Sequence, residues 1–337
     1  MNKKLTVIDS RGEVLSCVLS PARSYEEQLD ELFKFGKSGG HHVSFDGRSV
    51  KAVDCFCQET LSDFPVLSLE DCDEEVRLSW CREEKRRGPI QDLHSHTYYS
   101  FCGKDRPEAI VEAAIAGGVE LFGICDHNYG VGFGRKDAYK APVDTVPLTY
   151  GKHALRRYFD HIDLIREKYA DRIRILRGIE VATDAALGTV IVPEDADISF
   201  FDYCLIEHLD HESSNTSGDL FAFAERCGCH RVGVAHTDLF AFIGQKGEDP
   251  YRYFKRMAEC NIFWEMNVSY DSIHKYREHP YMLRFFEDAE QQAIVRESGV
   301  RVSVGFDGHR VEDYRPDRVV AACHRLTAMG IKLAFEE

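Results

Sequence analysis

The sequence contains no run of apolar residues that approaches the roughly 18 needed for a helix across a bilayer. Residues 1–9 become polar too early for the apolar region of a secretory signal, so we expect no export signal. A surplus of positive charge is also missing, because 42 Lys and Arg stand against 57 Asp and Glu and give a net charge of −15. Proteins that hold long nucleic acid by its phosphates draw on such a surplus. We therefore expect neither a membrane nor long nucleic acid as a partner.

The sequence has no repeat or low-complexity tract, and its hydrophobic content of 44% excludes disorder as the main state. The unusual features are 15 His and 12 Cys among 337 residues. Cys125 and Cys204 lie in apolar runs, where a free thiol packs as a small hydrophobic group. Because disulfide frameworks belong to short exported chains, we expect free thiols and a cytoplasmic location.

We expect residues 1–88 to form a small α+β appendage, whose role the sequence does not reveal. Apolar runs on both sides of residues 9–12 predict one hairpin, and Asp46-Gly47 predicts a second. Ser24 has capping-box spacing before an apolar helical pattern, which predicts that a helix begins there. The charged stretch at residues 68–87 predicts an exposed connecting helix.

After Pro89, short apolar runs alternate with stretches that carry helix signals. Polar or turn residues bound each run, as expected of strands that are buried on both faces. Alternating β and α units predict a parallel sheet, and seven strands over about 250 residues predict a closed barrel near the size of a (β/α)8 barrel. We therefore expect one α/β barrel at residues 89–337. The expected strands are residues 90–93, 119–125, 173–181, 203–206, 232–235, 262–268 and 302–306, and the expected helices are residues 107–116, 153–169, 219–227, 251–260, 281–298 and 316–329.

Residues of the types that bind metals follow these strands. In a parallel barrel the carboxyl ends of all strands meet on one face, where active sites form, so we expect these side chains to share one cup. His94 and His96 alternate along a strand and therefore point the same way, and Asp307 has the same spacing from His309. The candidate metal ligands are His94, His96, His127, Glu180, His208, His236, Asp307 and His309.

The combination of neutral imidazoles and carboxylates suits Zn²⁺, Mn²⁺ or Fe²⁺ better than Ca²⁺ or Mg²⁺. The candidate ligands are too many for one tetrahedral ion, which predicts two or three ions, with Glu180 suited to bridge two of them. Two ions about 3.5–4 Å apart clamp the attacking and leaving oxygens of phosphoryl transfer, and coordination lowers the pKa of bound water to about 7. The predicted reaction is hydrolysis by a metal-bound hydroxide, with Asp307 and His236 expected to act through the metal-bound water.

These motifs resemble those of the PHP family (polymerase and histidinol phosphatase), and they occur in the family's order. The resemblance runs from Gln91 to His309 and implies a distorted (β/α)7 barrel, similar to a TIM barrel, with a trinuclear site that hydrolyses phosphate esters. The matching motifs are Asp92-Leu93-His94-Ser95-His96-Thr97 for H-x-H-T, Asp126-His127 for D-H, Gly178-Ile179-Glu180 for G-x-E, His208 and His236 for the single histidines, and Asp307-Gly308-His309 for D-x-H.

The resemblance also implies how the ligands divide among three ions. Cys102 stands where the family places a further ligand of the third ion. Because a thiolate can bind zinc, Cys102 is either a substitute ligand or the sign of a weak or empty third site. The implied sets are His94, His96, Glu180 and Asp307 for the first ion, Glu180, His208 and His236 for the second, and His127 and His309 for the third.

Three nearby residues have alternative roles that the sequence leaves open. His211 could replace His208, although His208 lies closer to the strand end. Asp126 and Glu265 either orient imidazoles or water, a common arrangement around metals, or satisfy buried backbone groups.

The expected substrate is a small phosphorylated molecule, which needs positive groups near the metals. Residues 128–151 form a long insertion with glycines at 130, 132 and 134, which predicts either a flexible lid over the substrate or a surface loop. Histidinol phosphate, nucleotide esters and oligonucleotide ends are all candidate substrates. The cations expected on the active face are Lys104, Arg135, Lys136 and, as the best candidate for a phosphate contact, Arg310.

Two other functions fit parts of the pattern. Amidohydrolase barrels also begin with H-x-H, but they commonly bridge their metals with a Lys, and the corresponding strand ends here carry Glu180 and His208 instead. A regulatory module could keep the metal cup without turnover, but decayed sites usually lose ligands, and this ligand set is nearly complete. Phosphoester hydrolysis is therefore the favoured interpretation.

Overall fold

The chain divides into two compact units, Met1–Arg87 with His324–Gly330 and Gly88–Cys323 with Ile331–Glu337. Among the described residues, no helix is both long and apolar enough to cross a membrane. The cysteines with described side chains are all free thiols. The computed structural model describes residues 1–8, 14–33, 41–55, 57–58, 60–73, 81–82, 88–100, 102–132, 148–184, 198–211, 214, 216, 219–269 and 277–336.

The smaller unit is built on a six-stranded antiparallel sheet with the strand order β3-β4-β5-β1-β2-β6. Both expected hairpins are present, because β1 pairs with β2 and β3 pairs with β4. The hydroxyl of Ser24 accepts a hydrogen bond from the backbone N–H of Glu27 at 3.1 Å, as the capping pattern predicts. The elements are β1 (Asn2–Ile8), β2 (Val14–Leu19), α1 (Tyr25–Phe33), β3 (His41–Phe45), β4 (Ser49–Asp54), β5 (Thr60–Cys72) and β6 (Cys81–Arg82).

The exposed helix expected at residues 68–87 is wrong where the structure describes this stretch. Residues 68–72 complete β5, and Cys81–Arg82 form β6. Leu69 pairs with Leu5 of β1 and packs against the core of the sheet. The fit of alternate apolar side chains to a half-buried strand therefore outweighs the high charge density of the stretch. Residues 74–80 and 83–87 lie outside the described residues.

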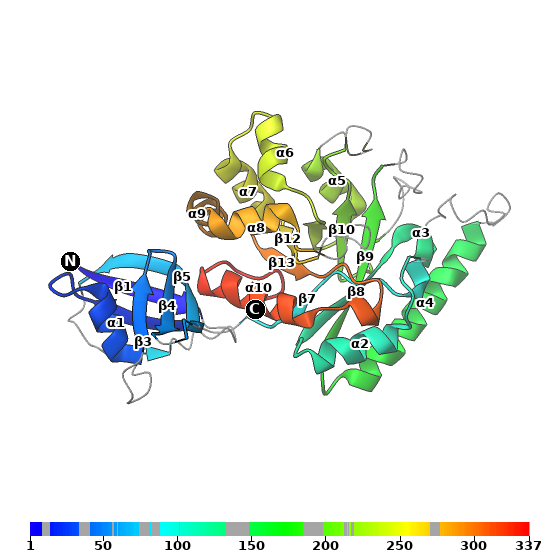
Figure 1. The fold of residues 1–337 in the computed structure, drawn as a ribbon. Coiled ribbons are helices and arrows are strands. Elements are labelled where there is room, and N and C mark those ends of the chain that lie inside the picture. Colours follow the sequence, from blue (N-terminus) through cyan, green and yellow to red (C-terminus); the bar gives the residue numbers. More distant parts are fainter. Residues whose placement is uncertain are drawn as a thin grey trace. The chain divides into compact units, whose positions relative to one another are not determined.

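The larger unit contains a seven-stranded parallel sheet with the strands in sequential order from β7 to β13. Figure 1 shows this sheet with helices on its outer side. Each strand coincides with one expected apolar run, and the predicted α/β barrel is confirmed. The strands are β7 (Gln91–Asp92), β8 (Leu121–His127), β9 (Arg174–Ala182), β10 (Tyr203–Glu207), β11 (Val232–Val234), β12 (Ile262–Asn267) and β13 (Val302–Gly305).

The first and last strands meet, so that the sheet is nearly closed. The backbone N–H of Leu93 donates to the carbonyl of Val304 at 2.9 Å, and beyond these strands Ser95 and Gly308 form a parallel bridge. The carboxylate of Asp92 reinforces this seam, because it accepts from the Phe306 backbone N–H at 3.1 Å and from the Tyr314 hydroxyl at 2.8 Å.

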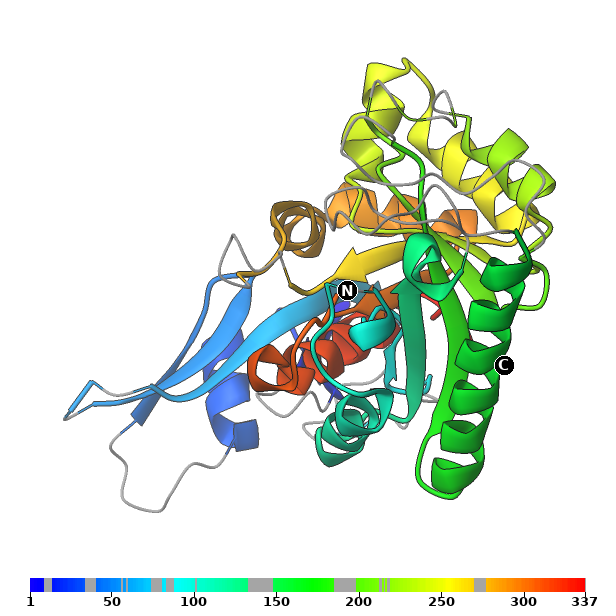
Figure 2. The same cartoon turned by 90° about the vertical axis from the view of Figure 1, so that its right-hand side faces the viewer.

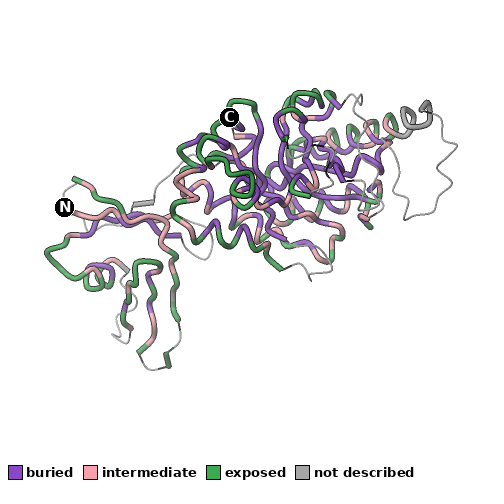
Figure 3. The backbone as a smooth tube through the Cα atoms, turned by 90° about the horizontal axis from the view of Figure 1, so that it is seen from above, coloured by how far each residue is buried: buried purple, intermediate pink, exposed green. Residues whose placement is uncertain are grey.

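The inside of the barrel is filled by side chains, with Tyr203 among the largest. Tyr203 is fully buried, and its hydroxyl donates to the carbonyl of Leu93, which follows β7, three strands away from β10 in the sheet. Gly178 leaves room for this ring, since a Cβ there would lie 2.3 Å from Tyr203 Cζ. Cys125 belongs to the same apolar cluster, as expected for a cysteine in an apolar run. Figure 3 shows the buried residues gathered in the interior of this unit.

The helices follow the expected alternation with the strands, and α4 runs along β9 (Figure 2). The one helix expected at residues 281–298 is in fact two. Asp288 has an extended backbone between them, and its carboxylate caps the second helix by accepting from the N–H groups of Glu290 and Gln291, each at 3.0 Å. The helices are α2 (Pro107–Ala116), α3 (Asn128–Val131), α4 (Leu148–Tyr169), α5 (Leu220–Cys227), α6 (Leu239–Gln245), α7 (Pro250–Glu259), α8 (Pro280–Glu287), α9 (Ala289–Ser298) and α10 (Pro316–Ala328).

The insertion expected as a loop at residues 128–151 begins and ends in helices. Residues 128–131 form the short helix α3, and residues 148–151 already belong to α4. The side chain of Asn128 fixes α3 by accepting from the backbone N–H of Ala182 at 2.9 Å. Residues 133–147, with Arg135 and Lys136, lie outside the described residues, so the lid hypothesis stays a prediction.

Candidate metal centre

The candidate ligands lie at the carboxyl ends of six of the seven strands, β7 to β11 and β13. His94 and His96 follow β7, His127 ends β8, and Glu180 lies near the end of β9. Each of the other positions comes directly after a strand or within a few residues of its end. Three of them turn sharply there, since φ is positive at His208 (61°), His236 (24°) and Asp307 (56°). Such backbone angles are uncommon in residues other than glycine and cluster at functional sites.

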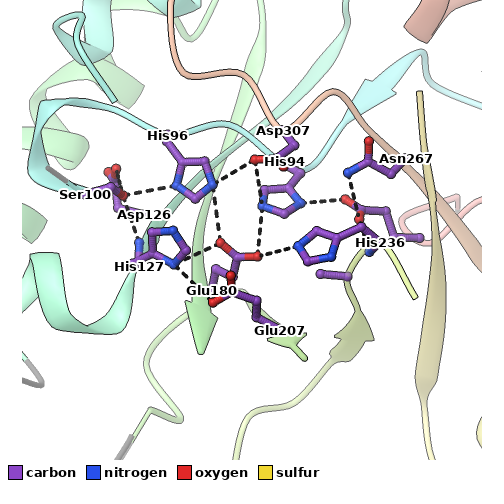
Figure 4. A network of polar contacts seen from close by, with 12 residues as sticks. His94, His96, Ser100, Asp126, His127, Glu180, Glu207, His236, Asn267 and Asp307 are labelled. Carbon is purple, nitrogen blue, oxygen red and sulfur yellow. Dashed lines mark hydrogen bonds and ion pairs between the residues drawn. The ribbon is translucent and has the colours of Figure 1, made fainter. Parts of the chain in front are cut away.

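Glu180 is at the centre of this group (Figure 4). Its side chain is only 1% exposed. One carboxylate oxygen, Oε1, lies 3.3 Å from Nε2 of both His94 and His236. The other, Oε2, lies 3.3 Å from Nε2 of His96 and 3.0 Å from Nδ1 of His127. Although burial opposes ionisation, the nearby imidazoles of His94 and His127 hold the pKa of Glu180 well below its usual range.

Asp307 closes the other side of the same cup. Its Oδ1 lies 3.1 Å from Nε2 of His96, 3.6 Å from Nε2 of His94 and 3.7 Å from Nδ1 of His309. The rings of His96 and His309 stack with their centroids 4.6 Å apart. Asp307 and His309 are therefore in contact with the same imidazoles that surround Glu180.

Hydrogen bonds behind the cup fix the tautomers of His94 and His96. Nδ1 of His94 lies 2.8 Å from Oε1 of Glu265, and a carboxylate can only accept, so His94 donates from Nδ1. Nδ1 of His96 lies 3.1 Å from the hydroxyl of Ser100, which itself donates to Asp126. With Nδ1 as the donor, the neutral form of each ring keeps its lone pair on Nε2, the atom that faces the carboxylates of the cup. This tautomer is the one that a metal ligand needs.

The alternatives for Glu265 and Asp126 are resolved differently at the two residues. Glu265 both orients an imidazole and satisfies a buried backbone group. One oxygen contacts His94, and the other accepts from the backbone N–H of His236 at 2.7 Å. Asp126 accepts from the backbone N–H and hydroxyl of Thr97, at 2.7 and 2.8 Å, and reaches His96 only through Ser100. Asp126 thus mainly satisfies local polar groups.

The donor atoms of the cup fit divalent metal ions. Several of them are buried without a hydrogen-bond partner, namely His94 Nε2, His127 Nδ1, Glu180 Oε2 and Glu207 Oε2. Buried polar atoms rarely stay unsatisfied, and a cation would satisfy all of these. Within the described residues, the three-donor groups whose atoms lie within 4.8 Å of one another are His94–His96–Glu180, His96–Asp307–His309, His96–Cys102–His127 and His127–Glu180–Glu207.

Cys102 is brought to the cup, next to His96 and His127. Its thiol is partly buried, and this burial raises its pKa against the opposing effect of His96. The position agrees with that of a substitute ligand, and the role itself stays a prediction.

His208 is on the wall of the cup but in none of these three-donor groups. Its Nε2 lies 3.2 Å from Oε1 of Glu207, and its Nδ1 is buried without a hydrogen-bond partner. Burial lowers its pKa to about 4. His211 does not take its place, because His211 is 42% exposed and pairs with Asp184 at 3.0 Å.

The cup opens into a cavity of about 220 Å³. The sequence pattern did not single out four of the residues that line it, namely Glu207, Asn267, Ser269 and His279. Asn267 ends β12, so its strand-end position was a usable signal, whereas His279 precedes α8 and follows no strand. Burial lowers the pKa of His279 to about 4. Glu207 is the further carboxylate of the wall, and burial together with the charge of Glu180 raises its pKa to about 8.

The predicted phosphate-binding cations are not among the described residues that line this cavity. Arg310 is exposed and its guanidinium lies 3.0 Å from Glu312. Lys104 is exposed, and its backbone N–H donates to the carbonyl of His309 at 2.9 Å. Arg135 and Lys136 lie outside the described residues. The substrate contacts of these four residues stay predictions.

The family model described as "PHP domain" matches residues 92–297 of the chain. This match ends before Asp307 and His309, which the fold nevertheless brings to the same cup. No curated protein matches the chain.

Two solved structures resemble the chain at low identity. One is the histidinol phosphate phosphatase of Lactococcus lactis subsp. lactis Il1403 in complex with zinc, L-histidinol and phosphate, with 15% identity, a TM-score of 0.42, and coverage of 73% of this chain and 95% of that one. The other is a protein assigned as a histidinol phosphatase from Listeria monocytogenes, with 17% identity, a TM-score of 0.37, and coverage of 66% of this chain and 96% of that one.

Proposed function

This chain belongs to the PHP domain family, and on that basis we propose that it is a metal-dependent phosphoesterase that hydrolyses a phosphate ester of a small molecule or nucleotide. The observation that carries the proposal is the buried carboxylate of Glu180, which contacts four imidazoles that come from three strand ends. Such a mixture of nitrogen and oxygen donors suits Zn²⁺, Mn²⁺ or Fe²⁺. The activity resides in the barrel at residues 89–337, and residues 1–88 are an appendage.

Two or three divalent ions would occupy the cup. Bound there, they would provide a water of lowered pKa and positive charge that polarises the phosphoryl group. Glu180 would bridge two of them, because its carboxylate contacts histidines that belong to different ligand sets. The ligand sets are His94, His96, Glu180 and Asp307, then Glu180, His208 and His236, and then His127, His309 and Cys102.

The residues of the chain prepare the cup for this role. Glu265 and Ser100 hold His94 and His96 in the tautomers that keep Nε2 unprotonated. Asp307 and His236 are partly exposed, with side chains 13% and 24% accessible, so they can meet the reacting water. Both would act on that water through the ions that they hold, and the carboxylate of Asp307 would accept its proton.

The cavity favours a compact phosphorylated substrate. Its volume of about 220 Å³ admits a phosphate group with a small attached portion, and its lining is polar. The protein's net charge of −15 opposes the approach of an anion, so attraction has to come from the ions in the cup and from local cations such as Arg310 and Lys104.

The proposal is tested with metal-depleted protein that is reconstituted with Zn²⁺, Mn²⁺ or Fe²⁺ and offered a panel of phosphomonoesters, phosphodiesters and cyclic amides. We expect metal-dependent release of phosphate, its loss in Asp307→Asn, and its retention in Glu259→Gln, an exposed control at the end of α7. Hydrolysis of the amides alone would favour an amidohydrolase. Metal binding without turnover of any substrate would favour a regulatory module.

A further inference from the structure

Glu207, the last residue of β10, points into the cup beside the predicted ligands (Figure 4). Its side chain is only 13% exposed. Oε2 lies 3.7 Å from Nδ1 of His127, and Oε1 lies 3.2 Å from Nε2 of His208. The sequence motifs assign the end of this strand to His208 and give Glu207 no role.

Three donor atoms converge at this place without satisfying one another. His127 Nδ1, Glu180 Oε2 and Glu207 Oε2 are each buried and each without a hydrogen-bond partner. The three residues offer donors that lie within 4.8 Å of one another. Two carboxylates in one buried pocket repel each other when both are ionised, and a neutral imidazole does not offset this repulsion. A cation among the three atoms removes the repulsion and satisfies every donor.

The barrel itself sets this arrangement. The three residues lie on β8, β9 and β10, which are consecutive neighbours in the sheet. His127 pairs in register with Glu180, and Glu207 pairs with Ala182, two positions further along β9. Because side chains alternate along a strand, Glu180 and Ala182 share one face, and Glu207 is directed to the same side as Glu180.

We propose that Glu207 is a metal ligand and that it holds one ion together with His127 and Glu180. This inference rests on the proposed metal-dependent function but concerns ion binding rather than turnover. It adds a carboxylate to the ligands around His127, which favours Mn²⁺ or Fe²⁺ at this position relative to a site of imidazoles and thiolate. Nε2 of His208 orients this carboxylate through its contact to Oε1, and Nδ1 of His208 stays available to the second ion.

The test compares Glu207→Gln with the wild-type protein and with Glu259→Gln. Metal content after reconstitution is measured by elemental analysis, and Mn²⁺ and Zn²⁺ affinities are measured by calorimetric titration of the metal-free proteins. We expect Glu207→Gln to lose one ion per chain, or to bind that ion at least about tenfold more weakly, whereas Glu259→Gln binds as the wild type does. Wild-type stoichiometry and affinity in Glu207→Gln would overturn the proposal.

A second readout separates ion binding from a structural role. Without metal, Glu207→Gln should melt at the same temperature as the wild type or higher, because the neutral amide is close in shape to the carboxyl group and places no charge beside Glu180. Addition of metal should raise its melting temperature less than it raises that of the wild type. A metal-free variant that is already less stable, with an unchanged response to metal, would assign Glu207 a structural role and overturn the proposal.

Wild-type crystals loaded with Zn²⁺ provide an answer that does not depend on the folding of any variant. Anomalous scattering at the zinc edge should place an ion about 2.0–2.2 Å from Oε2 of Glu207. Ions found only beyond bonding distance from Glu207 would contradict the proposal. A protein that binds this ion but releases no phosphate would leave Glu207 a ligand while the proposed hydrolysis fails.

Discussion

Oε1 of Glu265 lies 2.8 Å from Nδ1 of His94, and both side chains are fully buried. The two residues are 171 positions apart in the chain and meet because β12 and the end of β7 belong to one barrel. The contact connects a predicted ligand to β12, a strand whose end provides no predicted ligand. The barrel therefore uses that strand to orient a ligand rather than to provide one.

Glu265→Gln should weaken metal binding without removing a ligand. The neutral amide makes His94 less basic and no longer enforces the tautomer with Nδ1 protonated, because a rotated amide can donate instead of accept. We expect about 10- to 100-fold weaker binding of one ion, measured by competition with a fluorescent zinc chelator. Glu225→Gln, on the exposed surface near the end of α5, is the matched control. An affinity equal to that of the wild type would show that the Glu265 contact only satisfies buried groups.

The number of ions in the cup depends on whether the Cys102 thiolate is a ligand. If its thiolate completes the group with His96 and His127, the reconstituted protein should bind three ions per chain, and Cys102→Ser should bind two. In the cobalt-substituted protein, a thiolate-to-cobalt charge-transfer band should be present and should disappear in Cys102→Ser.

Cys260→Ser removes an exposed thiol elsewhere and should keep the cobalt band. Two ions per chain in the wild-type protein, with no thiolate band, would reject the trinuclear site and leave Cys102 as a packing residue.

The sequence predicted the barrel well because buried parallel strands leave a strong local signal. Each short apolar run became a strand, and the order of the strands in the sheet follows the order of the chain. The common position of the ligands followed from the same rule, since strand ends of a parallel barrel converge.

Other features depend on contacts that no local pattern contains. Glu207 stands next to a histidine in a recognisable motif, and only the register of β10 against β9 shows that its carboxylate faces the cup. His279 follows no strand and reaches the cavity through the packing of α8. The high charge density around Leu69 is typical of an exposed helix, whereas the pairing with β1 that makes this stretch a strand leaves no local pattern.

Arg310→Ala should lower kcat/KM for phosphate esters if this guanidinium contacts the phosphate. In the structure the Arg310 side chain pairs with Glu312 at 3.0 Å. On substrate binding, the phosphate would replace the carboxylate of Glu312 as the partner of this guanidinium. A charge-assisted hydrogen bond contributes about 1.5–3 kcal/mol, which corresponds to a loss of roughly 10- to 100-fold. Arg315→Ala removes another exposed arginine that pairs with a nearby aspartate, and it should leave kcat/KM unchanged. Equal kinetics of Arg310→Ala and Arg315→Ala would exclude Arg310 from the substrate contacts.

Asp92 and Tyr314 should give the seam of the barrel a pH-dependent stability. Burial raises the pKa of Asp92 to about 6, and the hydrogen bond from the Tyr314 hydroxyl opposes this rise. Because the pKa is about 3.9 in an unfolded chain, the folded protein keeps the proton to a higher pH. The stability that Asp92 contributes is therefore complete below about pH 4 and is lost as the pH rises through about 6.

Tyr314→Phe removes the donor that stabilises the ionised carboxylate, so the pKa of Asp92 should rise further. The variant should lose about 1–3 kcal/mol of unfolding free energy at about pH 8, where Asp92 of the wild type is ionised, and less at about pH 5. Urea denaturation at the two pH values measures both losses, and Tyr251→Phe, which changes an exposed tyrosine, is the control. A loss of the same size at both pH values would contradict this prediction, because it would mean that the Tyr314 hydroxyl stabilises neutral and ionised Asp92 equally.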